Sequence, residues 1–325
     1  MKFMKKVFVT LMAMGLAVSM LAGCGSSKKE ETYRVGICQL VQHEALDAAT
    51  KGFKDALTEK LGDKVTFDEQ NASGDSATCA TIVNQFVSGD TDLILANATP
   101  ALQAAAAATD EIPILGTSIT DYATALEIED WTGVTGKNIS GTSDLAPLDE
   151  QAKMLQEMFP DAENVGLLYC SAEANSSYQI RVIKEALEGM GFSCIERSFA
   201  DSNDIASVTT QLASECDVIY IPTDNSAASN TEVINNICLP AGVPIIAGEE
   251  GICRGCGVAT LSISYYDIGY KAGEMAYDIL VNGKDVSAME VEYAPNVTKK
   301  YVASRCEELN VTVPDGYEAI DESAE

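Results

Sequence analysis

The sequence repeats itself at a nearly constant spacing, and this repeat restricts the possible folds more than any other feature. Short segments of the first half return in the second half, in the same order, 125 to 131 residues later. The matching segments are Val35-Gly36 with Val165-Gly166, Lys54, Ala56 and Leu57 with Lys184, Ala186 and Leu187, Asp92-Leu93-Ile94 with Asp217-Val218-Ile219, and Ile112-Pro113-Ile114 with Val243-Pro244-Ile245. Matches in one order at one offset indicate two copies of a single array, not a solenoid.

Short apolar segments alternate with helix-length amphipathic stretches inside the first copy. This alternation predicts a parallel sheet covered by helices. The expected strands are 35–38, 65–67, 93–96 and 112–115, and the expected helices are 45–61, 76–87 and 100–108. We therefore expect an α/β fold with two Rossmann-like parallel-sheet lobes joined by a hinge.

Two such sheets form a ligand site where they face each other, because open parallel sheets bind ligands beyond the carboxyl ends of their strands. After the second copy, 265–283 predicts a helix and 291–293 a strand, which we expect to return to different lobes through a hinge of three crossings. The predicted N-terminal lobe is 33–120 plus 262–284, the predicted C-terminal lobe is 121–261 plus 285–314, and 315–325 is predicted to be an acidic tail.

The first residues indicate export. Three lysines precede an uncharged, mostly apolar run over 7–20, which is too short to span a membrane comfortably. Leu21-Ala22-Gly23-Cys24 resembles the bacterial lipoprotein box, which implies a signal peptide over 1–23, a lipid on Cys24 and a tether over 24–32. Two acyl chains suffice for stable anchoring on the outer face of the cytoplasmic membrane. The alternative is an ordinary secretory signal.

The charge of the mature chain excludes some partners. Once the three signal-peptide lysines are removed, 18 basic residues face 49 acidic ones. Nucleic acid needs a basic surface, so it is not an expected ligand. Anionic lipid is not attracted either, so the lipid anchor is the only membrane contact that we expect. About 300 residues are enough for two domains with proper cores.

Ten cysteines in an exported chain raise the question of disulfides. Lipidation of Cys24 leaves nine, which is an odd number. Cys38, Cys170 and Cys238 lie in apolar segments, where cysteine behaves as a small hydrophobe, so we expect mostly free, buried thiols. Cys253-Arg254-Gly255-Cys256 is either a disulfide or half of a metal site, and a single such pair is a weak metal signal. We expect no metal.

The motifs of the common enzyme classes are absent from the sequence, including GxSxG, HExxH, the Walker loop and GxGxxG. His43 is the only histidine, and no nucleophile motif accompanies it. We therefore expect a binding protein without catalytic residues or cofactors.

Four segments carry a resemblance to a known family. They are Val35-Gly36-Ile37-Cys38-Gln39-Leu40-Val41-Gln42-His43 with Ala45-Leu46-Asp47, Ile221-Pro222-Thr223-Asp224-Asn225, Ile246-Ala247-Gly248-Glu249-Glu250, and Tyr265-Tyr266-Asp267-Ile268-Gly269. The chain resembles bacterial ABC-transporter substrate-binding lipoproteins of the tryptophan/tyrosine type, which have the type I periplasmic-binding-protein fold. Gln42 and Glu44 depart from the residues expected there, an acidic residue and a proline.

The resemblance implies a two-lobed protein, expected as a monomer, that closes on a free amino acid and delivers it to an ABC permease and its ATPase. An aromatic ligand is implied, namely tyrosine, tryptophan or phenylalanine. A surface adhesin or sensor on the same fold is the alternative function.

An amino-acid ligand needs donors for its carboxylate, an anion for its ammonium group and a pocket for its side chain. The candidate ligand-binding residues lie at strand ends and helix starts. They are Gln39, Leu40, His43, Ala98, Thr99, Thr117, Ser118, Asn175, Ser176, Asp224, Asn225 and Glu250. Thr99, Asn175 and Ser176 are either carboxylate donors or helix caps. His43 is either a stray surface residue or a contact for an aromatic ring.

Asp224 is the first choice for the ammonium partner, because it follows a buried strand and corresponds to Thr99 in the other copy. The alternative is that Asp224 only caps a helix. Glu249 and Glu250 are adjacent acids after another buried strand, at least one of which should face the cleft, and Glu250 is the weaker ammonium candidate. Trp131 is expected to pack in the core or hinge.

Overall fold

The computed structural model describes residues 32–322, so the predicted signal peptide and Cys24 lie outside the described residues. The first lobe, called lobe N, contains a sheet with the strand order β11-β5-β4-β3-β1-β2, in which neighbouring strands pair in parallel. Its strands are β1 (Tyr33–Gln39), β2 (Val65–Asn71), β3 (Leu93–Asn97), β4 (Ile114–Ile119), β5 (Ile139–Ser143) and β11 (Glu292–Tyr293).

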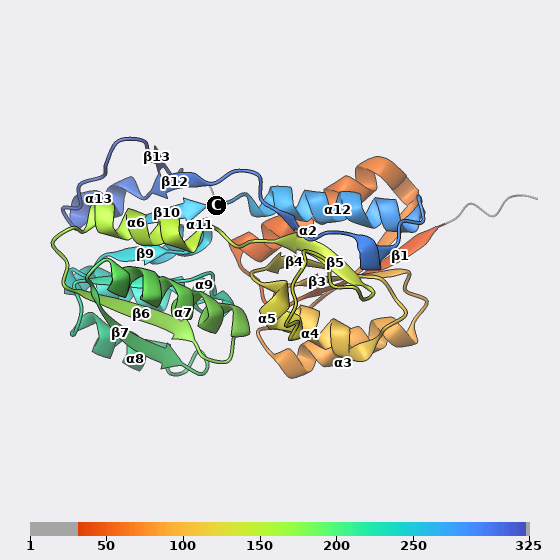
Figure 1. Ribbon diagram of the computed structural model, residues 1–325, viewed down its shortest axis with the longest axis horizontal. Coiled ribbons are helices and arrows are strands. Elements are labelled where there is room, and N and C mark those ends of the chain that lie inside the picture. The colour runs from red at the N-terminus through yellow and green to blue at the C-terminus, as the bar shows by residue number, and fades with distance from the viewer. Residues whose placement is uncertain (1–31, 323–325) are drawn as a thin grey trace, which may run out of the picture. The chain divides into compact units, whose positions relative to one another are not determined.

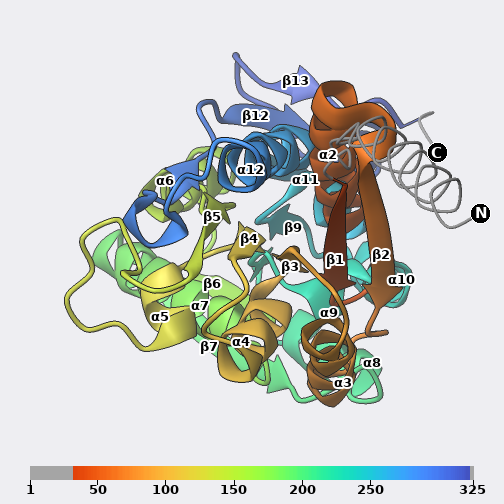
Figure 2. The same cartoon turned by 90° about the vertical axis from the view of Figure 1, so that its right-hand side faces the viewer.

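Helices cover both faces of this sheet. The helices are α2 (Glu44–Leu61), α3 (Ser76–Ser88), α4 (Thr99–Ala108), α5 (Tyr122–Leu126) and α12 (Tyr265–Leu280), with 3₁₀ turns η1 (Gly62–Lys64) and η2 (Val286–Ala288). In Figure 2, α2 and α12 lie on one side of the strands, and α3, α4 and α5 lie on the other. Separate buried apolar clusters join the two helix groups to the sheet, as a doubly wound fold requires.

The second lobe, called lobe C, contains a sheet with the strand order β13-β12-β10-β9-β8-β6-β7. Its strands are β6 (Asn164–Cys170), β7 (Ser193–Phe199), β8 (Val218–Ile221), β9 (Ile245–Ala247), β10 (Ala259–Ser262), β12 (Thr298–Tyr301) and β13 (Glu318–Ala319). Strand β12 pairs antiparallel with β10, whereas the other pairs are parallel.

The helices of lobe C are α6 (Leu148–Met158), α7 (Ala174–Gly189), α8 (Ile205–Ala213), α9 (Asn225–Ala228), α10 (Thr231–Ala241), α11 (Glu250–Cys256) and α13 (Ala303–Glu308). One buried cluster packs α6 and α7 against the sheet, and another packs α8, α10 and α11 against it. Figure 1 shows the two lobes side by side, with the chain running between them.

The predicted lobe boundaries need correction. Strand β5 pairs with β4 and β11 pairs with β5, so 121–143 and 285–293 belong to lobe N, not to lobe C. Helix α12 and strand β11 therefore return to the same lobe, and β12 returns to the other. The predicted tail is also partly wrong, because β13 pairs with β12 inside it. The chain does cross between the lobes three times, at 144–147, 263–264 and 294–297.

The sequence repeat is confirmed by matching contacts in the two lobes. Asp92 accepts a hydrogen bond from the backbone N–H of Arg34 at 2.7 Å, which fixes the start of β1. Asp217 accepts from the N–H of Asn164 at 2.8 Å, which fixes the start of β6. The repeated aspartate therefore holds the first strand of each lobe beside the third.

Helices α2 and α12 lie unusually close together. A Cβ atom on Gly269 would lie 2.0 Å from the carbonyl oxygen of Ala49, and one on Gly52 would lie 2.1 Å from that of Tyr266. Only glycine permits such an approach of two backbones. The packing matters for the site, because α12 begins directly after the crossing at 263–264.

The nine cysteines among the described residues are free, as the sequence predicts, and most of them are buried. Cys253 and Cys256 are both unbonded thiols in the core of lobe C. Among residues 32–322, no cluster of three or more possible metal-ligating side chains occurs. Trp131 packs against the core of lobe N, where its ring stacks on Tyr122 with centroids 6.3 Å apart.

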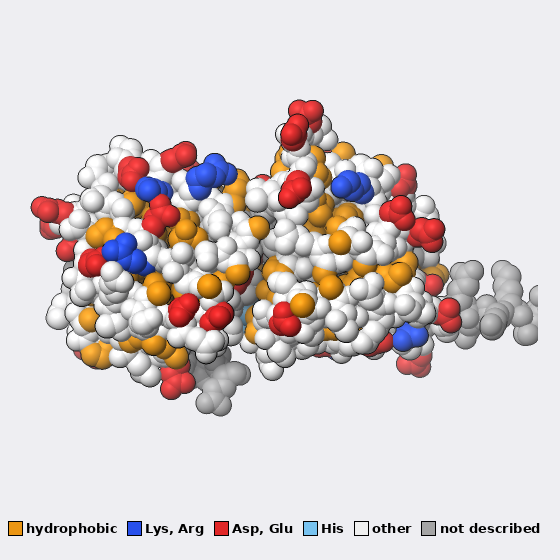
Figure 3. All heavy atoms as spheres, turned by 90° about the horizontal axis from the view of Figure 1, so that it is seen from below, with side chains coloured by type: hydrophobic (Ala, Val, Ile, Leu, Met, Phe, Trp, Pro, Cys, Tyr) orange, Lys and Arg blue, Asp and Glu red, His pale blue; other side chains and the backbone are white. Residues whose placement is uncertain are grey.

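The surface reflects the acidic composition. Figure 3 shows one face of the molecule, on which acidic side chains are scattered over both lobes and basic ones are fewer. Within the described part of the chain, no helix has the length and apolar character needed to cross a membrane.

Candidate functional site

A small cavity lies between the lobes, beyond the carboxyl ends of strands from both sheets. Its volume is about 10 Å³, which is roughly the space of one water molecule. Lobe N and the first crossing contribute His43, Leu46, Ser118, Asp144 and Tyr265, and lobe C contributes Asn175, Thr223, Asp224, Asn225, Ala228 and Glu249. An amino acid does not fit into this volume, so the lobes or their side chains must move to admit one.

The structure brings five of the predicted ligand-binding residues together at this cavity. They are His43, Ser118, Asn175, Asp224 and Asn225. Each of them lies at or beyond the end of a strand or at the start of a helix, which is the reason that the sequence pattern detected them. The cavity also contains residues that the sequence analysis did not select, namely Leu46, Asp144, Thr223, Ala228 and Tyr265, and it contains Glu249 in place of Glu250.

The other predicted residues do not line the cavity. These are Gln39, Leu40, Ala98, Thr99, Thr117, Ser176 and Glu250. The side chain of Gln39 forms hydrogen bonds inside lobe N: its amide nitrogen donates to Asp47, and its amide oxygen accepts from the Thr50 hydroxyl. Thr117 likewise accepts a hydrogen bond from Thr142 within the sheet.

Asp224 lines the cavity, but both of its carboxylate oxygens already have partners. Oδ1 accepts from the N–H of Ala227 at 2.8 Å, which caps α9, and Oδ2 accepts from the N–H of Cys170 at 2.6 Å. Burial, and then the nearby charge of Glu173, raise the pKa of Asp224 to about 7. These contacts favour the capping role that the sequence left open.

Among the acidic residues that line the cavity, Asp144 is the one with a carboxylate oxygen that has no hydrogen-bond partner among the described residues. It occupies the first crossing, directly after β5, and is 4% exposed. Oδ2 accepts a hydrogen bond from the Tyr265 hydroxyl at 2.9 Å, whereas Oδ1 is buried without a partner among the described residues. Burial raises the pKa of Asp144, and interactions with the hydroxyl groups of Tyr265 and Thr120 and with its own backbone N–H offset part of that effect. An arriving cation would supply the missing partner.

Glu249 also faces the cavity, although its oxygens are occupied. It caps α11 and accepts hydrogen bonds from the backbone N–H groups of Gly251 and Ile252. Burial raises the pKa of Glu249 to about 7.

Two further polar atoms in the cavity wall have no partner among the described residues. They are the hydroxyl of Ser118, which is 6% exposed, and Oδ1 of Asn175, which is 5% exposed. Buried polar atoms normally have hydrogen-bond partners, so each exception requires an explanation. Together with Asp144 Oδ1, these atoms place a donor and two acceptors around one small space.

His43 joins the two lobes. Its Nε2 lies 3.2 Å from Oδ1 of Asn225. The amide nitrogen of Asn225 donates to Glu173 at 2.6 Å, so Oδ1 is an acceptor and Nε2 of His43 must be the donor. Burial lowers the pKa of His43, which favours this neutral ring.

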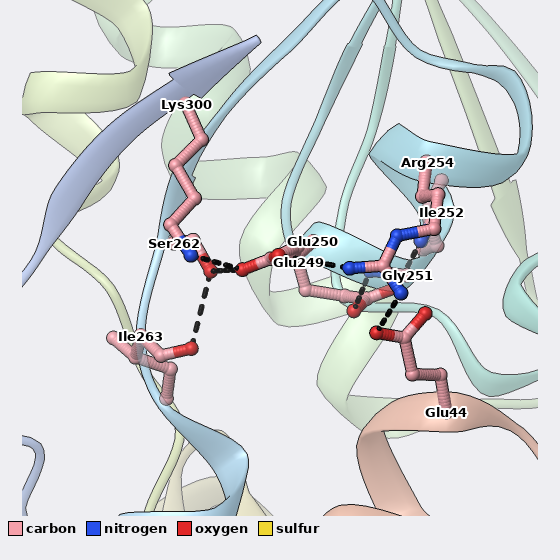
Figure 4. A network of polar contacts seen from close by, with 9 residues as sticks. All are labelled: Glu44, Glu249, Glu250, Gly251, Ile252, Arg254, Ser262, Ile263 and Lys300. Carbon is pink, nitrogen blue, oxygen red and sulfur yellow. Dashed lines mark hydrogen bonds and ion pairs between the residues drawn. The ribbon is translucent and has the colours of Figure 1, made fainter. Parts of the chain in front are cut away.

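A chain of charged side chains lies next to the cavity, at the crossings between the lobes (Figure 4). Arg254 on α11 contacts Glu44 on α2 at 2.6 Å and Glu250 at 3.1 Å. Glu250 in turn contacts Lys300 on β12 at 2.6 Å. Glu250 is therefore directed toward the crossings and not into the cavity, and the Arg254–Glu44 pair is a direct contact between the lobes.

A model of the family described as "ABC transporter substrate binding protein" matches residues 34–322. A curated protein named tyrosine-binding protein, from Clostridioides difficile, is 35% identical over 302 residues, which are 88% of this chain and 87% of that protein.

Solved structures support the same relationship. A domain from Streptococcus pneumoniae in complex with L-Trp is 29% identical, with a TM-score of 0.84, covering 89% of this chain and 100% of that one. The ligand-free, open structure of a substrate-binding protein with adhesive properties from Clostridium difficile is 35% identical, with a TM-score of 0.67 and coverages of 89% and 99%.

More distant structures show the fold alone. A leucine-binding protein from Thermotoga maritima is 13% identical and has a TM-score of 0.60, covering 77% of this chain and 83% of that one. The two doubly wound lobes with three crossings are thus the type I periplasmic-binding-protein fold. Because the family model spans nearly all of the described residues, this chain belongs to the ABC transporter substrate-binding proteins, which are binding proteins and not enzymes.

Proposed function

We propose that this extracytoplasmic protein captures an aromatic amino acid, tyrosine or tryptophan, in the cavity between its lobes and presents it to an ABC permease. The observation that carries the proposal is the convergence of three unpaired, buried polar atoms on that cavity: Asp144 Oδ1, Ser118 Oγ and Asn175 Oδ1. A zwitterionic ligand provides partners for such a set. The names of the relatives, which refer to tyrosine and to L-Trp, support the aromatic class.

Asp144 is the proposed partner of the ligand's ammonium group. A buried ammonium group needs a negative charge with an available lone pair. Asp144 offers Oδ1, whereas both oxygens of Asp224 are used by backbone N–H groups. The Tyr265 hydroxyl holds the other oxygen of Asp144 and thereby directs Oδ1. The Ser118 hydroxyl is the proposed donor to the ligand carboxylate.

The proposal requires lobes that close on the ligand, and a comparison with two relatives supports a nearly closed arrangement here. Identity is higher to the open, ligand-free relative than to the L-Trp complex, at 35% against 29%, yet the TM-scores are 0.67 and 0.84. The present lobe arrangement therefore resembles the ligand-bound form. Binding would begin in an open form and close toward this arrangement through contacts that the ligand makes with both lobes, with the cavity walls ending farther apart than they are here, because the present cavity does not hold an amino acid.

Calorimetric titration of protein that has been unfolded, freed of ligand and refolded tests this function. We expect saturable one-to-one binding of L-tyrosine or L-tryptophan and much weaker binding of L-leucine, which lacks an aromatic ring. Equal affinity for leucine would contradict the aromatic class, and no heat with any of the three would contradict the amino-acid assignment.

We further propose that a lipid on Cys24 anchors the protein to the outer face of the membrane, and that it works as a monomer. We expect Cys24→Ala to move the protein from the membrane fraction into the medium, because the thioether is the proposed attachment. Cell fractionation and the intact mass measure this effect. Cys194→Ala, at a half-buried thiol far along the chain, is the control and should leave anchoring unchanged. Retention of Cys24→Ala in the membrane, with no acyl mass on the wild type, would refute the anchor.

Adhesion is a second candidate function, because the relative from Clostridium difficile with 35% identity is described as having adhesive properties. Surface binding that survives loss of amino-acid binding in Asp144→Asn would support an adhesive role separate from the cavity.

A further inference from the structure

A charged contact joins the two lobes beside the cavity, and the proposed ligand does not account for it. Glu44 is the first residue of α2 in lobe N, and Arg254 belongs to α11 in lobe C. The guanidinium group of Arg254 donates to Glu44 Oε1 at 2.6 Å, and Figure 4 shows the two side chains pointing toward each other from their helices. Neither residue lines the small cavity, so neither is placed to touch a ligand there.

Lobe C holds Arg254 in position without help from Glu44. Arg254 Nη2 donates to Glu250 Oε1 at 3.1 Å, and Glu250 Oε2 accepts from Lys300 on β12 at 2.6 Å. The side chains of Arg254, Glu250 and Lys300 are 25%, 22% and 29% exposed. Because all three belong to lobe C, they stay together when the lobes part. The guanidinium group is therefore already oriented when Glu44 reaches it, which reduces the side-chain entropy lost when the pair forms.

Glu44 is able to leave this contact when the lobes open. It lines a hollow of about 360 Å³ whose walls also include parts of the crossings at 263–264 and 294–297, so a hinge motion there can move α2 away from α11. The Glu44 side chain is 47% exposed and lies in the first turn of a helix, where a negative charge is favourable. Opening therefore leaves no buried charge without a partner at Glu44.

Building on the proposed function, we propose that the Glu44–Arg254 ion pair is a latch, which forms when the lobes close and raises the affinity for the amino acid without touching it. An interaction that is present only in the closed form shifts the open–closed equilibrium by its own free energy, and the ligand binds correspondingly more tightly. Loss of the latch should act mainly on the rate of ligand release. The latch also gives a role to Glu44, where the family resemblance led us to expect a proline.

A double-mutant cycle on ligand-free protein tests the latch. We expect Glu44→Gln to weaken the binding of L-tyrosine or L-tryptophan by about two- to fivefold, the range for a partly exposed ion pair, and to raise the dissociation rate by the same factor. In the background of Arg254→Gln, the same change at Glu44 should have almost no further effect. Calorimetric titration measures the affinities, and stopped-flow fluorescence measures the rates.

The cycle is needed because Glu44 has a second charged neighbour. Burial is the main cause of the raised pKa of Glu249, and the negative charge of Glu44 adds to it. Glu44→Gln removes this repulsion in either background, so the cycle cancels it and retains the contribution of the pair. Glu215→Gln is the matched control, because its pair with Arg197 has the same distance of 2.6 Å and is also partly exposed but lies within lobe C. It should leave the affinity unchanged.

The salt dependence of binding is a second measurement of the latch. Salt screens charges that are partly exposed to solvent. The affinity of the wild type should therefore fall as salt is added, and that of Glu44→Gln should fall less. An equal salt dependence in the two proteins would count against the latch.

Two results of the cycle would overturn the proposal. They are an unchanged affinity in Glu44→Gln, and an equal weakening by this change with and without Arg254. If the wild type binds neither amino acid, the proposed function fails, and small-angle scattering from the ligand-free protein decides on the latch alone. A larger radius of gyration in Glu44→Gln than in the wild type would then support the latch, and equal radii would overturn it.

Discussion

Asp144→Asn is expected to weaken amino-acid binding by about 30-fold to several thousand-fold while leaving the fold intact. Loss of one partner of a buried charge pair costs roughly 2–5 kcal/mol, which corresponds to this range. Asparagine retains an oxygen that can accept from the Tyr265 hydroxyl, so the wall of the cavity should keep its shape. Calorimetric titration of ligand-free protein measures the change in affinity.

Asp224→Asn is the matched control, because Asp224 is equally buried and lines the same cavity. Its oxygens accept from the backbone N–H groups of Ala227 and Cys170, and asparagine keeps only one of these two acceptors, so stability should fall. Because neither oxygen is the proposed ligand contact, we expect a much smaller loss of affinity than in Asp144→Asn. The reverse result, with a large loss only in Asp224→Asn, would restore the assignment that the sequence first suggested.

The pH dependence of binding follows from the same assignment. Burial raises the pKa of Asp144 in the ligand-free, closed form, and only the ionised carboxylate attracts an ammonium group. Affinity should therefore be constant between the raised pKa and the alkaline pH at which the ligand's ammonium group loses its proton, and it should decrease as the pH falls through the raised pKa. Asp144→Asn should lack this part of the pH profile. An unchanged profile in the variant would mean that another group is responsible.

Gly269→Ala is expected to lower the free energy of unfolding by about 1–3 kcal/mol or more, since 1–3 kcal/mol is the typical cost of overpacking. The added Cβ would lie 2.0 Å from the carbonyl oxygen of Ala49, so α12 must move away from α2. Because Tyr265 begins α12 and bonds to Asp144, this movement should also weaken ligand binding. Urea denaturation followed by circular dichroism measures the stability.

Gly189→Ala is the control for this prediction. Gly189 lies at the end of α7 with nothing within 4 Å of the added Cβ, and its φ is not positive. Alanine at such a position is expected to be neutral or to stabilise by about 0.4–1 kcal/mol. If the urea concentration at the midpoint of unfolding were the same for Gly269→Ala and the wild type, the close packing of α2 and α12 would be refuted.

The two lobes could be predicted from the sequence because the repeat includes residues that stabilise the same feature in each lobe. Asp92 and Asp217 recur since each fixes the first strand of its lobe. Prediction failed at β5, whose sequence Ile-Ser-Gly-Thr-Ser lacks a large apolar run although the strand is fully buried. Gly141 in this strand faces the backbone of Gly116, a close contact that only the folded sheet reveals.

The error at β5 explains why Asp144 was not selected. The rule that ligand residues follow strand ends found His43, Ser118, Asn175 and Asp224, and it would have found Asp144 had β5 been recognised. Because Asp144 directly follows that unrecognised strand, the same rule was never applied to it.

Glu249 and Glu250 show a second limit of sequence reasoning. The two residues are adjacent and chemically alike, so composition and spacing do not separate them. The turn into α11 directs Glu249 back toward the cavity and Glu250 toward Lys300. Their different roles are set by the local backbone, which single-sequence patterns do not specify.

Native mass spectrometry of the mature chain tests the central claim most directly, because it identifies the bound solute by its mass. After ligand removal, we expect added L-tyrosine or L-tryptophan to give a one-to-one complex with the wild type, and Asp144→Asn to give none at the same concentration. If aromatic amino acids leave the mass of the wild type unchanged while a sugar or another solute binds, the account of this cavity is contradicted.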